Sequence, residues 1–300
     1  MGITRKDSEI LFFAKSAFGV SFSKTLTLGR LQLFVSKEDI GELRSIYVPS
    51  GPDQVTEVSF DTNYSEPLFK LLGAQQVESL DFSDYEDASI IHDMNEPISE
   101  QYHNSFSAIV DGGTIEHVFN FPVAIKNCMD CLEIGGHYIG ITPANNQMGH
   151  GFYQFSPELY FRVFSAENGF SVQKMLLKTN NSVYEVTDPL VARSRVELVN
   201  SSPATLVIIA KKIENTSRFQ TPQQSDYVGV WDTVNSTRTG NVKAGKSKLM
   251  NFYRTIMPKR LKIIFRNVYD ILTEEKVDDV DLGTIDPRHF KKIDLSPRTK

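Results

Sequence analysis

FSAIVDGGTIEHVFNFP, residues 106–122, passes from an apolar run to a group of small and polar residues. Its first five residues predict a strand in a buried sheet. Asp111, Gly112 and Gly113 follow, and glycines allow backbone to approach a ligand closely. Glu116 and His117 come next, although a strand that only filled a core would need no more than a turn there. The segment therefore predicts both a buried sheet and the edge of a binding site.

Apolar strands alternate with helices on both sides of this segment. The expected helices are residues 65–73, 122–136 and 157–169, the last with Ser156 as its N-cap and Pro157 in its first turn. Continuous apolar strands that alternate with helices favour an α/β fold with a mostly parallel sheet covered on both faces. The expected strands are residues 54–60, 75–83, 88–95, 105–113, 137–143, 170–178 and 204–212.

Three regions are expected along the chain. Residues 1–53 form an N-terminal region with an amphipathic helix, a short strand and a second helix, and Pro and Gly in VPSGPD mark its end. Residues 54–213 carry the alternating strands and helices. Residues 214–300 form a C-terminal extension with a basic, amphipathic helical stretch at 241–272, which fits a membrane surface, an acidic partner, or a helix docked on its own domain.

Composition limits the function classes. The chain has 300 residues, a net charge of -5 and 40% hydrophobic residues, which suits a globular protein and does not indicate a nucleic-acid binder. The absence of a long apolar run and of an export signal favours the cytoplasm. Cys128 and Cys131 form a C-x-x-C pair inside an expected helix, where a buried structural role is favoured over a redox role.

Acidic residues end several expected strands. Asp81, Asp93 and Asp111 each follow an apolar run, and the carboxyl ends of parallel strands share one edge of a sheet. Each acid alone also fits a turn or a helix cap. Their occurrence at successive strand ends predicts that all three converge on one crevice.

A polar loop, PANNQMGHGFYQFSPE at residues 143–158, leaves the same edge. His150 is the predicted base because histidine titrates near neutral pH, although it also fits a residue that only fixes the loop. His117 is expected to orient the Asp111 turn, and Glu116 to contact a ligand. No group of His, Cys and Asp has ligand spacing, so no metal site is expected. The remaining predicted contacts of the loop are Asn145, Asn146, Tyr153 and Gln154.

Several segments together resemble class I S-adenosylmethionine-dependent methyltransferases, in particular a small-molecule group with Glu-His-Val after the fourth strand. The segments are LLGAQQVESLDFS, IIHDMN, FSAIVDGGTIEHVFNFP, CLEIGGHYIGITP and LVIIAKK, within residues 54–213. The resemblance implies a Rossmann-like sheet. It also implies that Asp81 binds the cofactor ribose, that Asp93 and Met94 hold the adenine, and that Asp111 and Gly112 lie beside the methionine portion.

The match departs from the family at the first strand. In this family the first strand ends in an acidic, glycine-rich loop that contacts the cofactor. In EVSFDTNYSEPLFKLLG, residues 57–73, no glycine lies between the strand and the helix, so this loop is degenerate. Asp61 is the candidate for the acidic residue of the loop. The resemblance implies methyl transfer to a small polar acceptor, such as a hydroxyl of a sugar or secondary metabolite. The alternative is a non-catalytic protein of this fold that acts as an interaction module.

Overall fold

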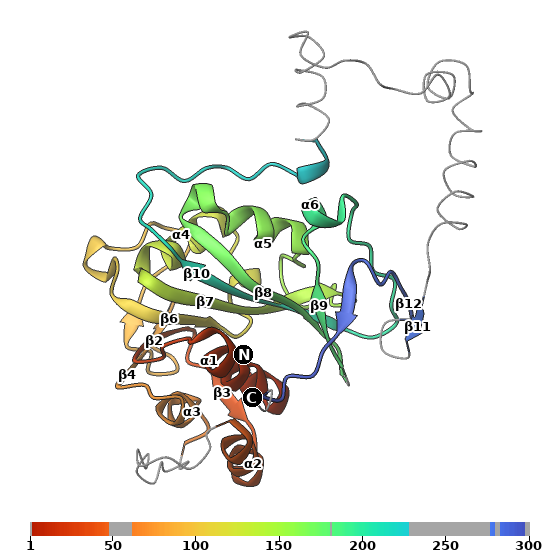
Figure 1. Cartoon of the computed structure of the whole chain (residues 1–300). Coiled ribbons are helices and arrows are strands. Elements are labelled where there is room, and N and C mark those ends of the chain that lie inside the picture. Colours follow the sequence, from red (N-terminus) through yellow and green to blue (C-terminus); the bar gives the residue numbers. More distant parts are fainter. Residues whose placement is uncertain (1, 48–61, 181, 228–276, 280–282, 298–300) are drawn as a thin grey trace, which may run out of the picture.

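A nine-stranded sheet forms the centre of the computed structural model, which describes residues 2–47, 62–180, 182–227, 277–279 and 283–297 (Figure 1). The strand order is β13-β9-β8-β10-β7-β6-β2-β4-β5. The strands are β2 (Lys24–Leu28), β4 (Gln76–Asp81), β5 (Ile90–Ile91), β6 (Phe106–Asp111), β7 (Leu132–Asn145), β8 (Phe170–Lys178), β9 (Val183–Val186), β10 (Ala204–Lys212) and β13 (Phe290–Lys292). Two small pairs lie outside the sheet: β1 (Gly2–Thr4) with β3 (Gln32–Phe34), and β11 (Val277–Asp279) with β12 (Gly283–Ile285).

The sheet is parallel in one half and antiparallel in the other. From β5 through β4, β2 and β6 to β7, each neighbouring pair is parallel. From β7 through β10, β8 and β9 to β13, each neighbouring pair is antiparallel. Among the described strands of this sheet, only β9 and β10 therefore run in the direction opposite to the others. The predicted α/β class is confirmed, and the parallel half carries the predicted strand ends.

Helices cover both faces of the sheet, as predicted (Figure 1). On one face, α1 (Arg5–Phe18), α2 (Lys37–Tyr47) and α3 (Glu66–Leu71) pack in one apolar cluster with the outward side chains of β6, β7 and β10. On the other face, α4 (Phe121–Cys131) and α5 (Pro157–Val163) pack in a second cluster, and the short α6 (Pro189–Ala192) follows β9. The largest buried side chains fall in these two clusters, so the sheet separates two cores.

The N-terminal region belongs to this sheet, which corrects the predicted boundary at residue 53. Strand β2 lies between β4 and β6, at the centre of the parallel half. The predicted first strand, residues 54–60, lies outside the described residues. Thr25 and Thr27 gave β2 a partly polar pattern, but both are buried, and their hydroxyls donate to the carbonyls of Phe22 and Glu78. Threonines whose hydroxyl groups form hydrogen bonds can thus occupy a buried central strand.

Helix α4 ends earlier than predicted. It stops at Cys131, and the residues expected to extend it to residue 136 begin β7 instead. The buried ammonium of Lys212 donates to the carbonyl oxygens of Met129 and Leu132, at 2.8 and 2.7 Å, and so satisfies groups that a helix end leaves open. Cys128 and Cys131 are buried at this end, and burial raises the pKa of the Cys131 thiol to about 12. The buried placement expected for the pair is confirmed.

The C-terminal extension is only partly described. Residues Phe290–Lys292 add β13 to the edge of the sheet beside β9, so this end of the chain is part of the domain. The basic stretch at 241–272 lies outside the described residues. No described helix is long and apolar enough to cross a membrane.

Candidate functional site

The parallel half of the sheet has a change of direction in its connections. Starting from β2, the chain adds β4 and β5 on one side and then β6 and β7 on the other. Ligands of open α/β sheets bind beyond the carboxyl ends of the strands at such a switch point. A cavity of about 290 Å³ lies there, lined by Leu80, Asp81, Phe82, His92, Asp93, Met94, Asn95, Thr114, His117 and Val118.

Two of the three predicted acids line this cavity. Asp81 is the last residue of β4, and its carbonyl accepts a hydrogen bond from His92 N at 2.8 Å, which links the ends of β4 and β5. Asp93 Oδ1 accepts from the backbone and side-chain amides of Asn95 at 2.9 and 2.8 Å, and these bonds lower the pKa of Asp93. Met94 is buried beside them. The predicted grouping of Asp81, Asp93 and Met94 is therefore present.

Asp111 does not line the cavity, although it was expected to converge with the other two acids. It is fully buried: Oδ1 accepts from the amides of Gly113 and Thr114 at 3.2 and 2.8 Å, and Oδ2 accepts from the Tyr138 hydroxyl at 3.0 Å. Burial raises its pKa to about 6 against the opposing effect of these bonds. The side chain fixes the turn that carries Thr114 into the cavity wall.

Gly112, which was also predicted to lie beside the methionine portion of the cofactor, is covered by another side chain. A Cβ placed on Gly112 would lie 2.9 Å from the Leu31 side chain, so Leu31 covers this glycine. Asp61, the predicted loop acid, lies outside the described residues. The residues that follow the central strand β2 are Gly29 and Arg30, and Arg30 pairs with Glu66 at 2.7 Å and lies over the Tyr64 ring.

Glu116 has the least satisfied carboxylate of the site. It is completely buried in the 3-10 helix Ile115–His117, and neither oxygen has a hydrogen-bond partner in the described part of the chain. Gly113 and Gly151 make room for it, because a Cβ on either would lie about 3 Å from its side chain (3.1 and 3.0 Å). Burial, and then the charge of Asp111, raise the pKa of Glu116 to about 8. A buried carboxylate of this kind is costly, which suggests a functional use.

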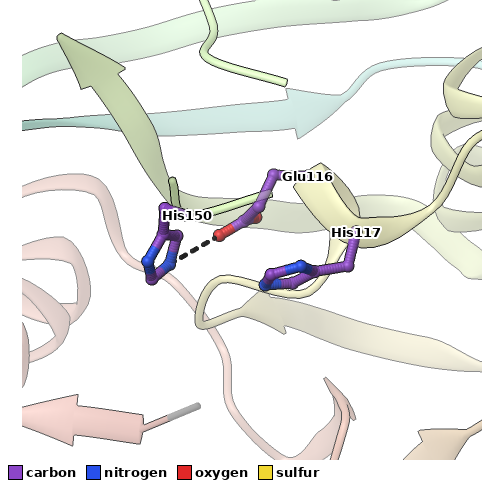
Figure 2. Close-up of side chains that lie close together, drawn as sticks. All are labelled: Glu116, His117 and His150. Carbon is purple, nitrogen blue, oxygen red and sulfur yellow. Dashed lines mark ion pairs between the residues drawn. The ribbon is translucent and has the colours of Figure 1, made fainter. Parts of the chain in front are cut away.

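His150 and His117 lie next to this carboxylate (Figure 2). His150 Nε2 is 3.3 Å from Glu116 Oε1, and the two imidazole rings are 5.6 Å apart. Burial and the neighbouring His150 lower the pKa of His117. The sequence did not predict this cluster, because His150 is distant from Glu116 in the chain. The pairs of glycines around both residues, at 112–113 and 149–151, were the only local signal.

The remaining polar residues of the loop form hydrogen bonds that fix the loop, one within it and the others to Phe119 and Asn200. These side chains were predicted to contact the acceptor, but each already forms a hydrogen bond within the protein. The Tyr153 hydroxyl donates to Phe119 O at 2.6 Å, the side chains of Asn145 and Asn146 donate to Asn200 at 2.6 Å each, and Gln154 Oε1 accepts from Gln147 N at 2.9 Å.

Two exposed aromatic rings border the cluster and were not predicted. Phe119 and Phe152 are 72% and 67% exposed and contact each other edge to face, 5.9 Å apart. Phe152 N donates to Glu116 O at 2.9 Å, which fixes this pair beside the buried carboxylate. An apolar surface thus adjoins the polar cluster.

A larger cavity, of about 470 Å³, lies elsewhere, between the start of α5, the α6 segment and residues 224–226. It contains none of the predicted site residues. Three of its charged groups are engaged, because Arg195 pairs with Asp226 at 2.5 Å and Glu158 accepts from Ser225 N at 2.7 Å. The smaller cavity is therefore the one that brings predicted site residues together.

No family model and no curated protein matches the chain. Solved structures that resemble it include a branched-chain polyamine synthase from Thermus thermophilus with N4-aminopropylspermidine and 5'-methylthioadenosine (13% identity, TM-score 0.36, 73% of this chain and 61% of that one). Another is 1,6-didemethyltoxoflavin-N1-methyltransferase from Burkholderia thailandensis with S-adenosylhomocysteine (9% identity, TM-score 0.36, 70% and 78%). The chain thus spans less than two thirds of the length of the polyamine synthase.

Proposed function

We propose that the chain is an S-adenosylmethionine-dependent methyltransferase that acts on a hydroxyl group of a small acceptor. The observation that supports this proposal most is the cavity at the switch point, which combines Asp81, Asp93 and Met94 and is bordered by His117. The sequence resemblance assigned the first three residues to the adenosine half of the cofactor.

The residues of the cavity suit an adenosine group. Asp81 has a carboxylate that can accept two hydrogen bonds from neighbouring ribose hydroxyls. Asp93 can accept from an exocyclic amine, since Asn95 bonds only one of its oxygens. The Met94 side chain offers a polarizable surface for an aromatic ring. The buried position of Asp111 makes it a positioning residue, which holds Thr114 at the wall.

The Glu116–His117–His150 cluster would serve the acceptor. When bound, the cofactor supplies an electrophilic methyl group, and the protein's part is to hold the acceptor in line and remove its proton. His150 is half exposed and lies in a glycine-flanked loop, so it can reach an acceptor that enters from solvent. Phe119 and Phe152 would pack against an apolar portion of that acceptor.

One observation favours the alternative, an interaction module without catalysis. Leu31 and Ile3 side chains lie against Gly112, where the resemblance places the methionine portion of the cofactor. A chain that binds nothing beyond the adenosine half would carry out no methyl transfer.

Ligand-dependent stability tests the proposal. S-adenosylhomocysteine at about 100 times its dissociation constant should add about 2.7 kcal/mol to the free energy of unfolding. The melting temperature would rise by roughly 5–10 °C for a domain of this size. Asp81→Ala should remove the shift, whereas Asp84→Ala, at an exposed acid outside the cavity, should keep it. No shift for the wild type at millimolar ligand would favour the interaction module.

A further inference from the structure

Three side chains of the site form an arrangement that the proposed function does not require. One carboxylate oxygen of Glu116, one ring nitrogen of His117 and one of His150 all lie within 4.8 Å of one another. Figure 2 shows the two rings beside the Glu116 carboxylate. Metal–ligand bonds of about 2.0–2.2 Å leave neighbouring ligands roughly 3–4 Å apart, so these three atoms need only small side-chain shifts to surround a single cation.

The buried carboxylate is the independent sign of a ligand. Glu116 is 0% exposed, and neither oxygen accepts a hydrogen bond from any other described residue. A buried carboxylate that accepts no hydrogen bond is rare in folded proteins, and the contact of His150 Nε2 with Glu116, at 3.3 Å, involves only Oε1. The space around it is also preformed, because Gly113 and Gly151 are the neighbours that leave it room.

We propose that Glu116, His117 and His150 bind one divalent transition-metal ion, of the class of Mn²⁺, Fe²⁺, Co²⁺ or Zn²⁺. Two imidazoles and one carboxylate suit these ions, whereas Mg²⁺ and Ca²⁺ favour sites made of oxygen atoms. Three protein ligands leave coordination positions open. His117 and His150 are both exposed, so the open side faces solvent and the cavity that His117 lines.

The cation would also bear on the chemistry of the site, in a way that rests on the proposed function. An acceptor hydroxyl bound at an open position would have a lower pKa, as water has on a bound metal ion, and would release its proton to solvent. His150 would then act as a ligand instead of the base. Metal binding itself is independent of whether the chain transfers methyl groups, so the two proposals can fail separately.

Titration of the tag-free full chain with Co²⁺, followed by visible absorption and calorimetry, tests the proposal without any cofactor. The wild type should bind close to one equivalent and develop d–d bands. Glu116→Gln, which keeps the shape but not the charge, and His150→Ala should each weaken binding by at least about tenfold. His103→Gln, at a histidine outside the cluster, is the matched control and should bind like the wild type. Zn²⁺ should compete for the site, and Mg²⁺ should not.

Two results would overturn the site. One is a wild type that binds neither Co²⁺ nor Zn²⁺ at micromolar concentrations. The other is a Glu116→Gln variant and a His150→Ala variant that both retain wild-type affinity, which would place the cation elsewhere. Because His150 is half exposed, its alanine variant should fold even if the Glu116 variant does not.

Discussion

Asp111 and Glu116 lie on either side of the same glycine turn, and both carboxylates are fully buried, but their surroundings are opposite. Asp111 accepts hydrogen bonds from two backbone amides and from the Tyr138 hydroxyl. Glu116 accepts none from other described residues and has an imidazole at 3.3 Å. The first arrangement stabilises a turn. The second leaves a buried carboxylate without hydrogen bonds from other described residues and in contact with one imidazole of an exposed loop, which is more typical of a binding site than of a structural site.

The largest effect is expected for Asp111→Ala. The change leaves the amides of Gly113 and Thr114 and the Tyr138 hydroxyl without an acceptor in a buried place. Each such group costs about 1–3 kcal/mol, so the free energy of unfolding should fall by about 3 kcal/mol or more. Urea denaturation measures the loss. A loss below about 1 kcal/mol would remove the distinction between the two carboxylates.

His137 tests whether burial without a partner is costly by itself. Its Nε2 has no hydrogen-bond partner among the residues that the structure describes, and burial lowers its pKa to about 4, below the unfolded value near 6.5. Between these values the unfolded chain binds a proton that the folded chain does not, so stability is lost as the pH falls from about 6.5 toward 4. The contribution at pH 4.5 is about 2–3 kcal/mol.

Comparison of the wild type with His137→Gln isolates this contribution. The variant should lose about 2–3 kcal/mol less than the wild type between pH 7 and pH 4.5. Asp111, whose raised pKa acts in the opposite direction, is present in both proteins and cancels. Equal pH dependence of the two proteins would show that His137 is protonated normally in the fold.

Tyr138→Phe removes one of the three bonds of Asp111 and keeps the ring, which stacks on Phe164. The free energy of unfolding should fall by about 1–2 kcal/mol, since one partner of a buried hydrogen bond is lost. Thermal denaturation checks this value. An unchanged melting temperature would mean that the two backbone amides alone hold Asp111.

The smallest effect is expected for Glu116→Gln. Because no hydrogen bond from another described residue is lost and a costly buried acid is removed, the metal-free variant should be within about 1 kcal/mol of the wild type or more stable. Urea denaturation with a chelator present measures the difference. A loss of 3 kcal/mol, as for Asp111, would make Glu116 a structural residue.

Much of the fold was predictable because apolar runs report burial directly. Strands β4, β6, β8 and β10 and the Ser156 cap of α5 follow the sequence closely. The central strand β2 was assigned to a separate region. The hydroxyl of its Thr27 donates to the carbonyl of Glu78 in β4, 51 residues away in the chain, and local composition does not report such a bond.

The position of a candidate site residue was predictable where it follows directly from the strand that carries the residue. Asp81 and Asp93 reach one cavity because strands β4 and β5 are adjacent and end together. Asp111 and Glu116 are both acids beside the same glycine pair in the sequence. Their surroundings differ because the amides of Gly113 and Thr114 and the Tyr138 hydroxyl of β7 bond Asp111, whereas the 146–151 loop brings His150 to Glu116. His150 was chosen for its type and loop, but its contact with Glu116 required the loop to return to Ile115–His117.

Calorimetric titration with S-adenosylhomocysteine tests the central claim, that the cavity of Asp81, Asp93 and Met94 holds the cofactor. We expect the wild type to bind one equivalent and Asp81→Asn to weaken binding at least about tenfold, or about 1.4 kcal/mol. Glu116→Gln should bind within about threefold of the wild type, because Glu116 does not line the cavity. Wild-type affinity in Asp81→Asn, or no binding by the folded wild type at millimolar ligand, would contradict it.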